Sequence, residues 1–406
     1  MANGPAVAYV PDRVFTARGD ACVEGMAVWI EGRHILAVVP VGDLPGGVPV
    51  ERLAGTTVLP GLIDAHVHLN LAGTGGRFEP LVEDDATLAV AAAAHARAAL
   101  ESGVTTVRDC GSRGQSTFAA RRAIEHGWFE GASIWAAGAM LTVPKGHCWP
   151  FGGEVSGTEG GRRGVRAQKA AGADFIKVIG SGGGTDGTYS WTPSFATEEL
   201  RAIVDEAHGL GMKVTVHCTC AEAMRRTALS GADQIEHGTF YTEGHGYEID
   251  TDAIHAVAEA GVAVTSTLAI SALLAERMTD VDDPAQRDTW RRMRDAWLES
   301  NRLMHESGIV HVAGTDAGWR HCDFQEMARE IACLRAIGLG GGESLRAATS
   351  TAARVMAMDG VGVLEAGSPA DLIAVEGDPV ADAAALSRVR LVVHRGRRTG
   401  PAPSAG

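Results

Sequence analysis

Short apolar runs alternate with helical stretches through the middle of this chain, and this alternation limits the folds that it can adopt. The apolar runs cover residues 58–68, 104–109, 133–141, 174–180, 213–218, 234–237, 262–268 and 309–315. Alanine-rich stretches that also carry Arg and Glu lie between them, including residues 86–101, 164–171, 197–210, 220–230, 251–260 and 285–307. Alternation of this kind predicts an α/β fold with a parallel sheet. Eight runs match the strand number of a (β/α)8 TIM barrel.

The two ends of the chain have a different texture. Near the start, runs such as residues 26–32 are short, apolar and broken by Gly, Asp and Pro. The same pattern returns near the end, in residues 370–375 and 389–394. Such broken runs are typical of short strands joined by tight turns. We therefore expect the two ends to combine into one satellite β domain.

The charge and composition of the chain argue against several kinds of partner. The 406 residues include 36 Lys and Arg against 50 Asp and Glu, a net charge of −14 at pH 7, whereas nucleic-acid binding needs clustered basic side chains. The start lacks the regions of a signal peptide, and no apolar stretch approaches the roughly 18 residues of a membrane span. The seven cysteines show no disulfide framework. We expect a cytoplasmic protein that acts on a small molecule, without a nucleic-acid or membrane partner.

Polar side chains that could bind a metal follow the apolar runs. His66 and His68 end the first run, and side chains alternate across a strand, so both imidazoles can bind one cation. Further candidates near the ends of later runs are Lys177, His217, His237 and Asp316. The active site of a (β/α)8 barrel lies at the C-terminal ends of its strands. The pattern therefore predicts a metal centre there.

Each of these residues also has a purely structural interpretation. An isolated pair of strand histidines is more often satisfied by hydrogen bonds than by a metal. Lys177 could form a salt bridge, and Asp316 could cap a helix. The placement that all six candidates share favours the metal-binding interpretation.

The motif P-G-L-I-D-A-H-V-H at residues 60–68 resembles the signature of the amidohydrolase superfamily. The likeness extends to residues 349–354 and 365–372 near the end of the chain. It is closest to the prolidase-like and imidazolonepropionase-like branch, which includes Xaa-Pro dipeptidases and hydrolases of aryl amides and ureas. This resemblance implies a (β/α)8 barrel over residues 58–361 and a small β-sandwich domain from residues 1–57 and 362–406.

The resemblance also implies a role for each metal ligand. His66 and His68 match the ligands of one metal ion, and His217 and His237 match those of a second. Lys177 matches a lysine that CO2 carboxylates and that bridges the two ions. Two divalent ions, Zn²⁺ by preference, are the expected cofactors.

Physical chemistry is consistent with these roles. A lysine on an apolar strand is desolvated, which favours reaction of its amine with CO2, and the carbamate of Lys177 can bridge ions about 3.5–4 Å apart. Coordination lowers the pKa of a bridging water to about 7. Asp316, the last ligand, can accept the proton of this water and pass it to the leaving nitrogen. By the same resemblance, His147 polarises the scissile carbonyl, although the residues before it depart from the glycine-rich loop usual in the family.

Aromatic and basic residues in the loops after the strands are candidate substrate contacts. They are Trp149, Tyr189, Tyr241, Trp319 and Arg320, with Trp191, Arg113 and Lys145 as further choices. Core packing would explain any one of the aromatic residues equally well. We interpret the glycine-rich segment 180–187 as a mobile loop over the metals, because it lacks the lysine of a phosphate-binding loop. Cys218 follows His217 where many dipeptidase-like relatives differ, which weakens a peptidase function, and we expect it to be a packing thiol.

The sequence thus favours a binuclear metal-dependent amidohydrolase that cleaves a C–N amide bond of an N-acyl amino acid, dipeptide or aryl amide. Three alternatives stay open. The first is a mononuclear deaminase or cyclic-amidine hydrolase of the same superfamily, and the second is a dehydratase or cyclase that uses the same metals. The third, a non-catalytic barrel scaffold, is disfavoured because all six ligands are present. The resemblance is also compatible with a homo-oligomer.

Overall fold

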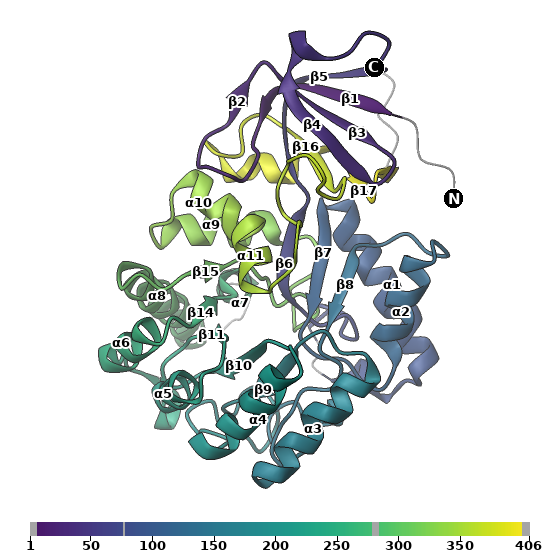
Figure 1. The fold of residues 1–406 in the computed structure, drawn as a ribbon. Helices are drawn as coiled ribbons and strands as arrows, with labels where there is room; N and C mark the ends of the chain where they lie inside the picture. The colour runs from purple at the N-terminus through teal and green to yellow at the C-terminus, as the bar shows by residue number, and fades with distance from the viewer. Residues whose placement is uncertain (1–5, 76–77, 278–283, 400–406) are drawn as a thin grey trace.

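The computed structural model describes residues 6–75, 78–277 and 284–399. In this part of the chain, a mixed β-sheet lies at one end of a larger α/β body (Figure 1). Segments from both ends of the chain, drawn in purple and yellow, contribute to the mixed sheet. None of the described helices combines the length and apolar character that crossing a bilayer requires.

Backbone pairing joins the two ends of the chain in the mixed sheet. Its strands are β1 (Val7–Val14), β2 (Val23–Glu24), β3 (Met26–Glu31), β4 (His34–Pro40), β5 (Val50–Pro60), β16 (Leu372–Glu376), β17 (Val389–His394) and β18 (Arg397–Thr399). They follow the order β18-β17-β16-β5-β1-β3-β4, with β2 paired to β1. The ends meet in the antiparallel pair β5 and β16, where Leu59 lies opposite Ile373.

Parallel strands form the core of the α/β body. One sheet contains, in hydrogen-bonding order, β15 (His311–Val312), β14 (Ala263–Thr265), β11 (Gln234–His237), β10 (Val214–Cys218) and β9 (Ile176–Ile179). A second contains β6 (Leu62–Val67), β7 (Val104–Asp109) and β8 (Ser133–Ala136). All eight strands fall within the apolar runs of the sequence. The predicted α/β class is therefore confirmed.

Isolated bridges connect these two parallel sheets on both sides. Leu141, which follows β8, pairs with Val178 of β9. On the other side, Val67 of β6 pairs with Ala317, which follows β15. The strands β6 and β9 are buried along their whole length, which explains their nearly continuous apolar sequence.

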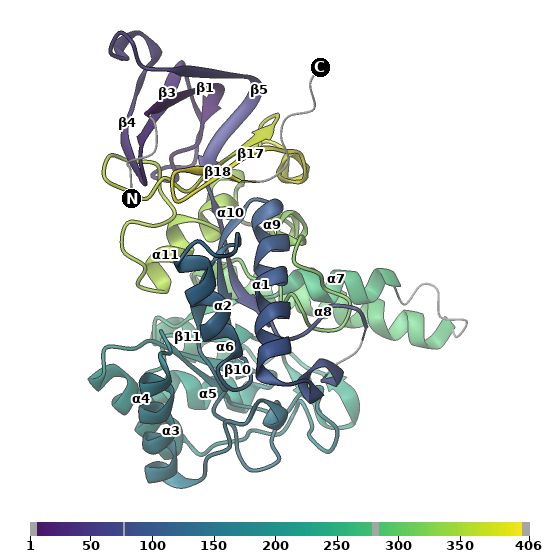
Figure 2. The same ribbon diagram turned by 90° about the vertical axis from the view of Figure 1, so that its right-hand side faces the viewer.

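Helices cover the outside of the parallel strands (Figures 1 and 2). They are α1 (Asp85–Glu101), α2 (Ser116–Glu125), α3 (Gly157–Ala171), α4 (Thr197–Gly209), α5 (Ala221–Ser230), α6 (Thr251–Glu259), α7 (Leu268–Arg277), α8 (Pro284–Glu306), α9 (Met327–Ala336), α10 (Gly341–Ala347) and α11 (Ser350–Val355). Gly172 and Gly231 cap α3 and α5 with φ angles of 102° and 83°, a conformation that glycine adopts readily. Figure 1 shows α9, α10 and α11 between the parallel strands and the mixed sheet.

The chain passes from the mixed sheet to the parallel strands at Gly61. Strand β5 continues through Pro60, so the first apolar run is divided between the two sheets, and β6 begins at Leu62. A Cβ atom on Gly61 would lie 2.1 Å from Thr105 Oγ1. Glycine is required here because the chain and β7 approach so closely. After Gly61 the chain continues as β6, which carries His66 and leads to His68.

Candidate active site

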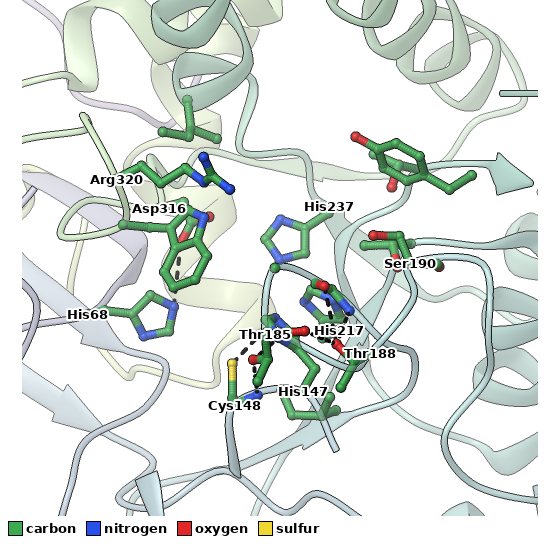
Figure 3. Close-up of a pocket in the computed structure, with 18 of the residues that line it drawn as sticks. His68, His147, Cys148, Thr185, Thr188, Ser190, His217, His237, Asp316 and Arg320 are labelled. Atoms are coloured by element: carbon green, nitrogen blue, oxygen red, sulfur yellow. Dashed lines mark hydrogen bonds and ion pairs between the residues drawn. The ribbon is translucent and has the colours of Figure 1, made fainter. Parts of the chain in front are cut away.

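The six predicted metal ligands line one cavity. His66, Lys177, His217 and His237 lie on β6, β9, β10 and β11, while His68 and Asp316 follow β6 and β15. All six residues are buried, with at most 8% of their surface exposed. Figure 3 shows four of them, His68, His217, His237 and Asp316, around the pocket. The structure thus brings together residues that are far apart in the sequence.

Three of the ligands form a compact triad. The Nε2 atoms of His66 and His68 lie 3.3 Å apart, and Asp316 Oδ1 is 3.5 Å and 3.4 Å from them. This spacing is close enough for one cation to bind all three atoms. Burial acts to raise the pKa of Asp316, but His66 and His68 outweigh it and hold this pKa well below its usual range. Asp316 also adopts a left-handed φ of 61°, which costs a non-glycine residue about 1–3 kcal/mol and is typical of functional sites.

A buried ion network behind the triad orients His66. His66 Nδ1 donates to Glu236 Oε2 at 2.6 Å, which leaves Nε2 to face the triad. Arg108 Nη2 and Thr215 Oγ1 both donate to Glu236 Oε1 at 2.5 Å, and Arg108 also donates to Gln234 at 2.7 Å. Burial acts to raise the pKa of Glu236, but the charge of Arg108 outweighs it and holds this pKa well below its usual range. The ionised Glu236 keeps the proton of His66 on Nδ1.

Hydrogen bonds also orient the histidines of the second pair. His217 Nε2 donates to the carbonyl of Gly182 at 3.3 Å, and His237 Nδ1 is 2.8 Å from Thr267 Oγ1. The ring centroids of His217 and His237 are 4.6 Å apart. Burial is the main cause that lowers the pKa of His237 to about 3 and that of His66 to about 4. These imidazoles are therefore neutral at pH 7, the form that binds metal ions.

Lys177 provides the test of whether this site suits a metal pair. Its side chain is buried, and its Nζ atom has no hydrogen-bond partner in the described part of the chain. A buried ammonium group without a partner is costly. Carboxylation would turn this group into an anion with two oxygen ligands. Together with the four histidines and Asp316, it fits divalent cations that accept nitrogen and oxygen ligands.

His147 faces the ligands from the loop after β8. Its ring centroid lies 4.8 Å from that of His217. Thr185 Oγ1 accepts the backbone N–H of Cys148 at 3.0 Å and lies 2.7 Å from His147 Nδ1 (Figure 3). If the Thr185 hydroxyl donates its own proton to Nδ1, the ring proton of His147 lies on Nε2, which is 3.3 Å from Cys148 Sγ. An Nε2–H donor at this position suits the stabilisation of a developing oxyanion.

The candidate metal ligands form the floor of a pocket of about 790 Å³. Its walls include the apolar side chains of Met140, Phe151, Ile270, Leu274, Trp290 and Trp297. A pocket of this size and character accommodates an organic molecule of drug-like size.

The structure brings most of the predicted substrate contacts to this pocket. Tyr189, Tyr241, Trp319 and Arg320 line it. Trp149 is not among the lining residues and is 44% exposed in the short 3-10 helix η3 (Trp149–Phe151), so its contact with substrate stays a prediction. The same helix turns Phe151, two residues later, into the pocket. Trp149 and Phe151 lie on either side of a proline, and the sequence alone does not tell which of the two rings points into the pocket.

The further choices lie outside the pocket lining. Arg113 donates to the carbonyls of Leu81 and Glu83, so it tethers a loop. Lys145 is exposed, and Trp191 stacks on Tyr189 with ring centroids 4.9 Å apart. Cys218 Sγ lies 3.2 Å from Thr227 Oγ1 of α5, which confirms the expected packing role of this thiol.

The glycine-rich segment 180–187 packs directly on the site. A Cβ atom would lie 2.6 Å from the ring of His147 if it were on Gly183, and 2.8 Å from Trp319 if it were on Gly184. Thr188 Oγ1 donates to the carbonyl of Thr185 at 2.8 Å, within the loop. These glycines have a steric role in the structure, and the mobility of the loop stays a prediction. They allow backbone to form part of the pocket wall.

Sequence reasoning missed two groups of residues, one buried behind the candidate ligands and one in the pocket wall. Glu236 precedes a predicted ligand on the same strand, but its contact with His66 spans 170 positions. On α8, Trp290, Met293 and Trp297 line the pocket, although we predicted this segment only as a helix between strands. Their spacing of three and four residues places them on one helix face and was the available signal.

The site is therefore a candidate metal centre in an α/β fold. The sequence profile of the amidohydrolase family matches residues 57–399, and the chain therefore belongs to this family. The family predicted from the H-x-H motif is thus confirmed.

Two similar proteins match most of the chain. An uncharacterized protein of Mycobacterium tuberculosis is 30% identical over 376 residues, which cover 88% of this chain and 90% of that protein. Ochratoxinase of Aspergillus niger is 25% identical over 373 residues, which cover 83% of this chain and 74% of ochratoxinase.

A solved structure also resembles the whole fold. The crystal structure of a Xaa-Pro dipeptidase with bound methionine aligns with a TM-score of 0.86 and 27% sequence identity. The alignment covers 97% of this chain and 99% of the dipeptidase chain. The likeness therefore includes the mixed sheet as well as the parallel strands.

Proposed function

We propose that the protein is a binuclear metal-dependent amidohydrolase that cleaves the C–N amide bond of a small substrate. The observation that carries this proposal is the buried amine of Lys177, which has no hydrogen-bond partner among the described residues and lies in a cavity with four histidines and Asp316. Membership of the amidohydrolase family supports the same reaction class.

The ligands divide into two sets. His66, His68 and Asp316 would hold one ion, His217 and His237 a second, and carboxylated Lys177 would lie between them. Zn²⁺ suits these nitrogen and oxygen donors. When bound, the ions would act as Lewis acids and lower the pKa of a water at the site.

The chain's own residues perform the proton transfers and the charge stabilisation. Asp316 is ionised at neutral pH and accepts the proton of the attacking water, then delivers it to the leaving nitrogen. His147, with its proton on Nε2, donates to the carbonyl oxygen as charge develops there. Arg320 lines the same pocket and is the candidate partner for a substrate carboxylate.

The proposal includes the architecture that presents these residues. We propose that the two parallel sheets close into a (β/α)8 barrel that begins after Pro60, where β5 ends, and that the described strands from the two ends of the chain form a β-sandwich. The bridges Leu141 to Val178 and Val67 to Ala317 support closure.

The substrate class we propose is an N-acyl amino acid, a dipeptide or an aryl amide. Similarity to a Xaa-Pro dipeptidase and to ochratoxinase supports this range. The test is a screen of these three classes with the zinc-loaded protein. We expect hydrolysis of at least one class, its loss after chelation and its recovery with zinc.

Variants of two lysines make the test specific. Lys177→Ala should abolish the hydrolysis, whereas Lys169→Ala, on an exposed position of α3, should leave it intact. Equal activity of the wild type and Lys177→Ala would contradict the proposal.

A mononuclear deaminase or cyclic-amidine hydrolase is the second candidate, and the compact triad of His66, His68 and Asp316 favours it because these atoms suffice for one ion. Such an enzyme would be fully active with one ion per chain. Lys177→Ala would then leave turnover largely unchanged.

A further inference from the structure

We propose that one face of α8, formed by Trp290, Met293 and Trp297, is a binding subsite for a bulky aromatic group of the substrate. We call this face the α8 aromatic subsite. The inference rests on the proposed function for the reaction at the pocket floor. It goes further by assigning selectivity to a helix that carries no metal ligand.

The position of the three residues on α8 is the first argument. Trp290, Met293 and Trp297 are three and four residues apart, so they share one face of the helix, and all three line the pocket. Each is only partly buried. The intervening Arg291 and Asp295 are exposed to solvent. The apolar face of α8 borders the cavity at these three residues, and Trp290 and Trp297 also pack against the hydrophobic core.

The neighbouring elements complete an apolar chamber. Ile270 and Leu274 of α7 are buried and line the same pocket. Figure 2 shows α7 and α8 extending together from one side of the α/β body. Tyr241 of β12 (Tyr241–Thr242) meets Trp297 edge to face, with centroids 6.3 Å apart and an angle of 89°.

The chemistry of this wall favours a flat apolar group. The polar ligands occupy the floor, so a scissile amide bound there would direct one of its substituents along the walls. Trp and Met contact an aromatic ring more favourably than an aliphatic chain of the same length, through ring packing and sulfur contacts. The pocket of about 790 Å³ also lies in the upper part of the usual range for ligand sites, roughly 300–1,000 Å³. An acetyl group would leave most of this volume unfilled.

The first experiment measures binding of 2-naphthoate to the zinc-loaded protein by calorimetry, so it requires no turnover. The double variant Trp290→Ala/Trp297→Ala should weaken binding at least about tenfold, because buried aromatic contacts are commonly worth that much. Trp290→Phe/Trp297→Phe should retain most of the affinity. Trp128→Ala is the matched control, because Trp128 is 77% exposed and does not line the pocket. Equal affinity of the double alanine variant and the wild type would overturn the subsite.

The second experiment compares N-(2-naphthoyl)glycine with N-acetylglycine. The double alanine variant should lose about tenfold in kcat/KM for the naphthoyl compound, mainly through KM, and less than about twofold for the acetyl compound. Equal losses for both would indicate a merely structural role and contradict the subsite.

The two experiments separate this inference from the proposed function. If 2-naphthoate binding depends on the two tryptophans but no amide is hydrolysed, the subsite stands and the proposed reaction is wrong. If amides are hydrolysed but the variants bind 2-naphthoate like the wild type, the reaction stands and the subsite is wrong.

Discussion

The floor of the pocket is formed by the candidate metal ligands, and its rim is formed by loop residues and α8. These two parts are built in different ways. Most floor residues come from buried strands, and His68 and Asp316 follow β6 and β15. Hydrogen bonds from other buried groups orient them, as Glu236 orients His66 at 2.6 Å. Rim residues come from loops and from α8, and some are open to solvent: Tyr189 is 55% exposed. Strand pairing fixes the floor, whereas helix packing and loop contacts set the rim. Under the proposed function, the reaction and its selectivity would reside in separable parts of the molecule.

A change at the centre of the floor should have the largest effect. Asp316→Asn removes both an anionic ligand and the proton acceptor, so we expect turnover to fall by about three orders of magnitude. Asp359→Asn, an exposed control, should retain wild-type turnover. Steady-state kinetics with the best substrate of the screen measure both. A variant of Asp316 that keeps more than about a tenth of the activity would exclude its role as base.

A change at Glu236, which lies behind the floor, should reduce turnover less than a change at Asp316. It should act by weakening metal binding. Glu236→Gln removes the charge that holds the proton of His66 on Nδ1 and leaves buried Arg108 without its counter-charge. We expect metal affinity to fall by about 10- to 100-fold, measured by competition with a chelator. Glu222→Gln, in an exposed pair with Arg226, is the control. Unchanged affinity would show that this network does not support the ligands.

At the border between floor and rim, Thr185 should act on His147 and on the backbone of Cys148, because its Oγ1 contacts both. Thr185→Val loses the hydroxyl that contacts His147 Nδ1, so we expect kcat to fall about tenfold, the value of one hydrogen bond, with little change in KM. Thr185→Ser keeps the hydroxyl and should restore kcat. If serine fails to rescue activity, the role of Thr185 is steric.

The next prediction concerns the stability of the folded protein, and it tests the contact between α9 and α7. Glu330 is fully buried on α9, and its Oε2 accepts the N–H of Ala269 in α7 at 2.6 Å. Burial raises the pKa of Glu330 from 4.5 to about 8. The folded protein therefore keeps a proton that the unfolded chain loses, and stability falls as the pH rises from about 4.5 to about 8.

Replacing this carboxyl group should remove that pH dependence. Glu330→Gln stays neutral, so its Tm relative to the wild type should rise by about 5 °C between pH 5 and pH 8, as followed by circular dichroism. A difference in Tm that is constant over this range would show that Glu330 is already ionised in the folded protein.

The floor could be predicted from the sequence because strands impose a period of two residues and end at a common edge. This rule identified His66 and His68, and it located β11 from the short run at residues 234–237. Contacts between strands that are distant in the sequence left no comparable pattern in the sequence. The pairing of His66 with Glu236 depends on how β6 and β11 are arranged, 170 residues apart.

The rim was harder to predict because its side chains could turn either way. Trp149 faces solvent while Phe151 faces the pocket, and both lie on one short helix. The glycines at 183 and 184 have a steric role that depends on His147 and Trp319, which are distant in sequence. Sequence periodicity describes individual elements, whereas the rim depends on contacts between them.

The most direct test of the account is the number of zinc ions per chain, measured by elemental analysis of the purified protein at full activity. We predict two ions for the wild type and at most one for Lys177→Ala, with Lys169→Ala unchanged. One ion per chain in the fully active wild type, and the same content in Lys177→Ala, would contradict the binuclear centre.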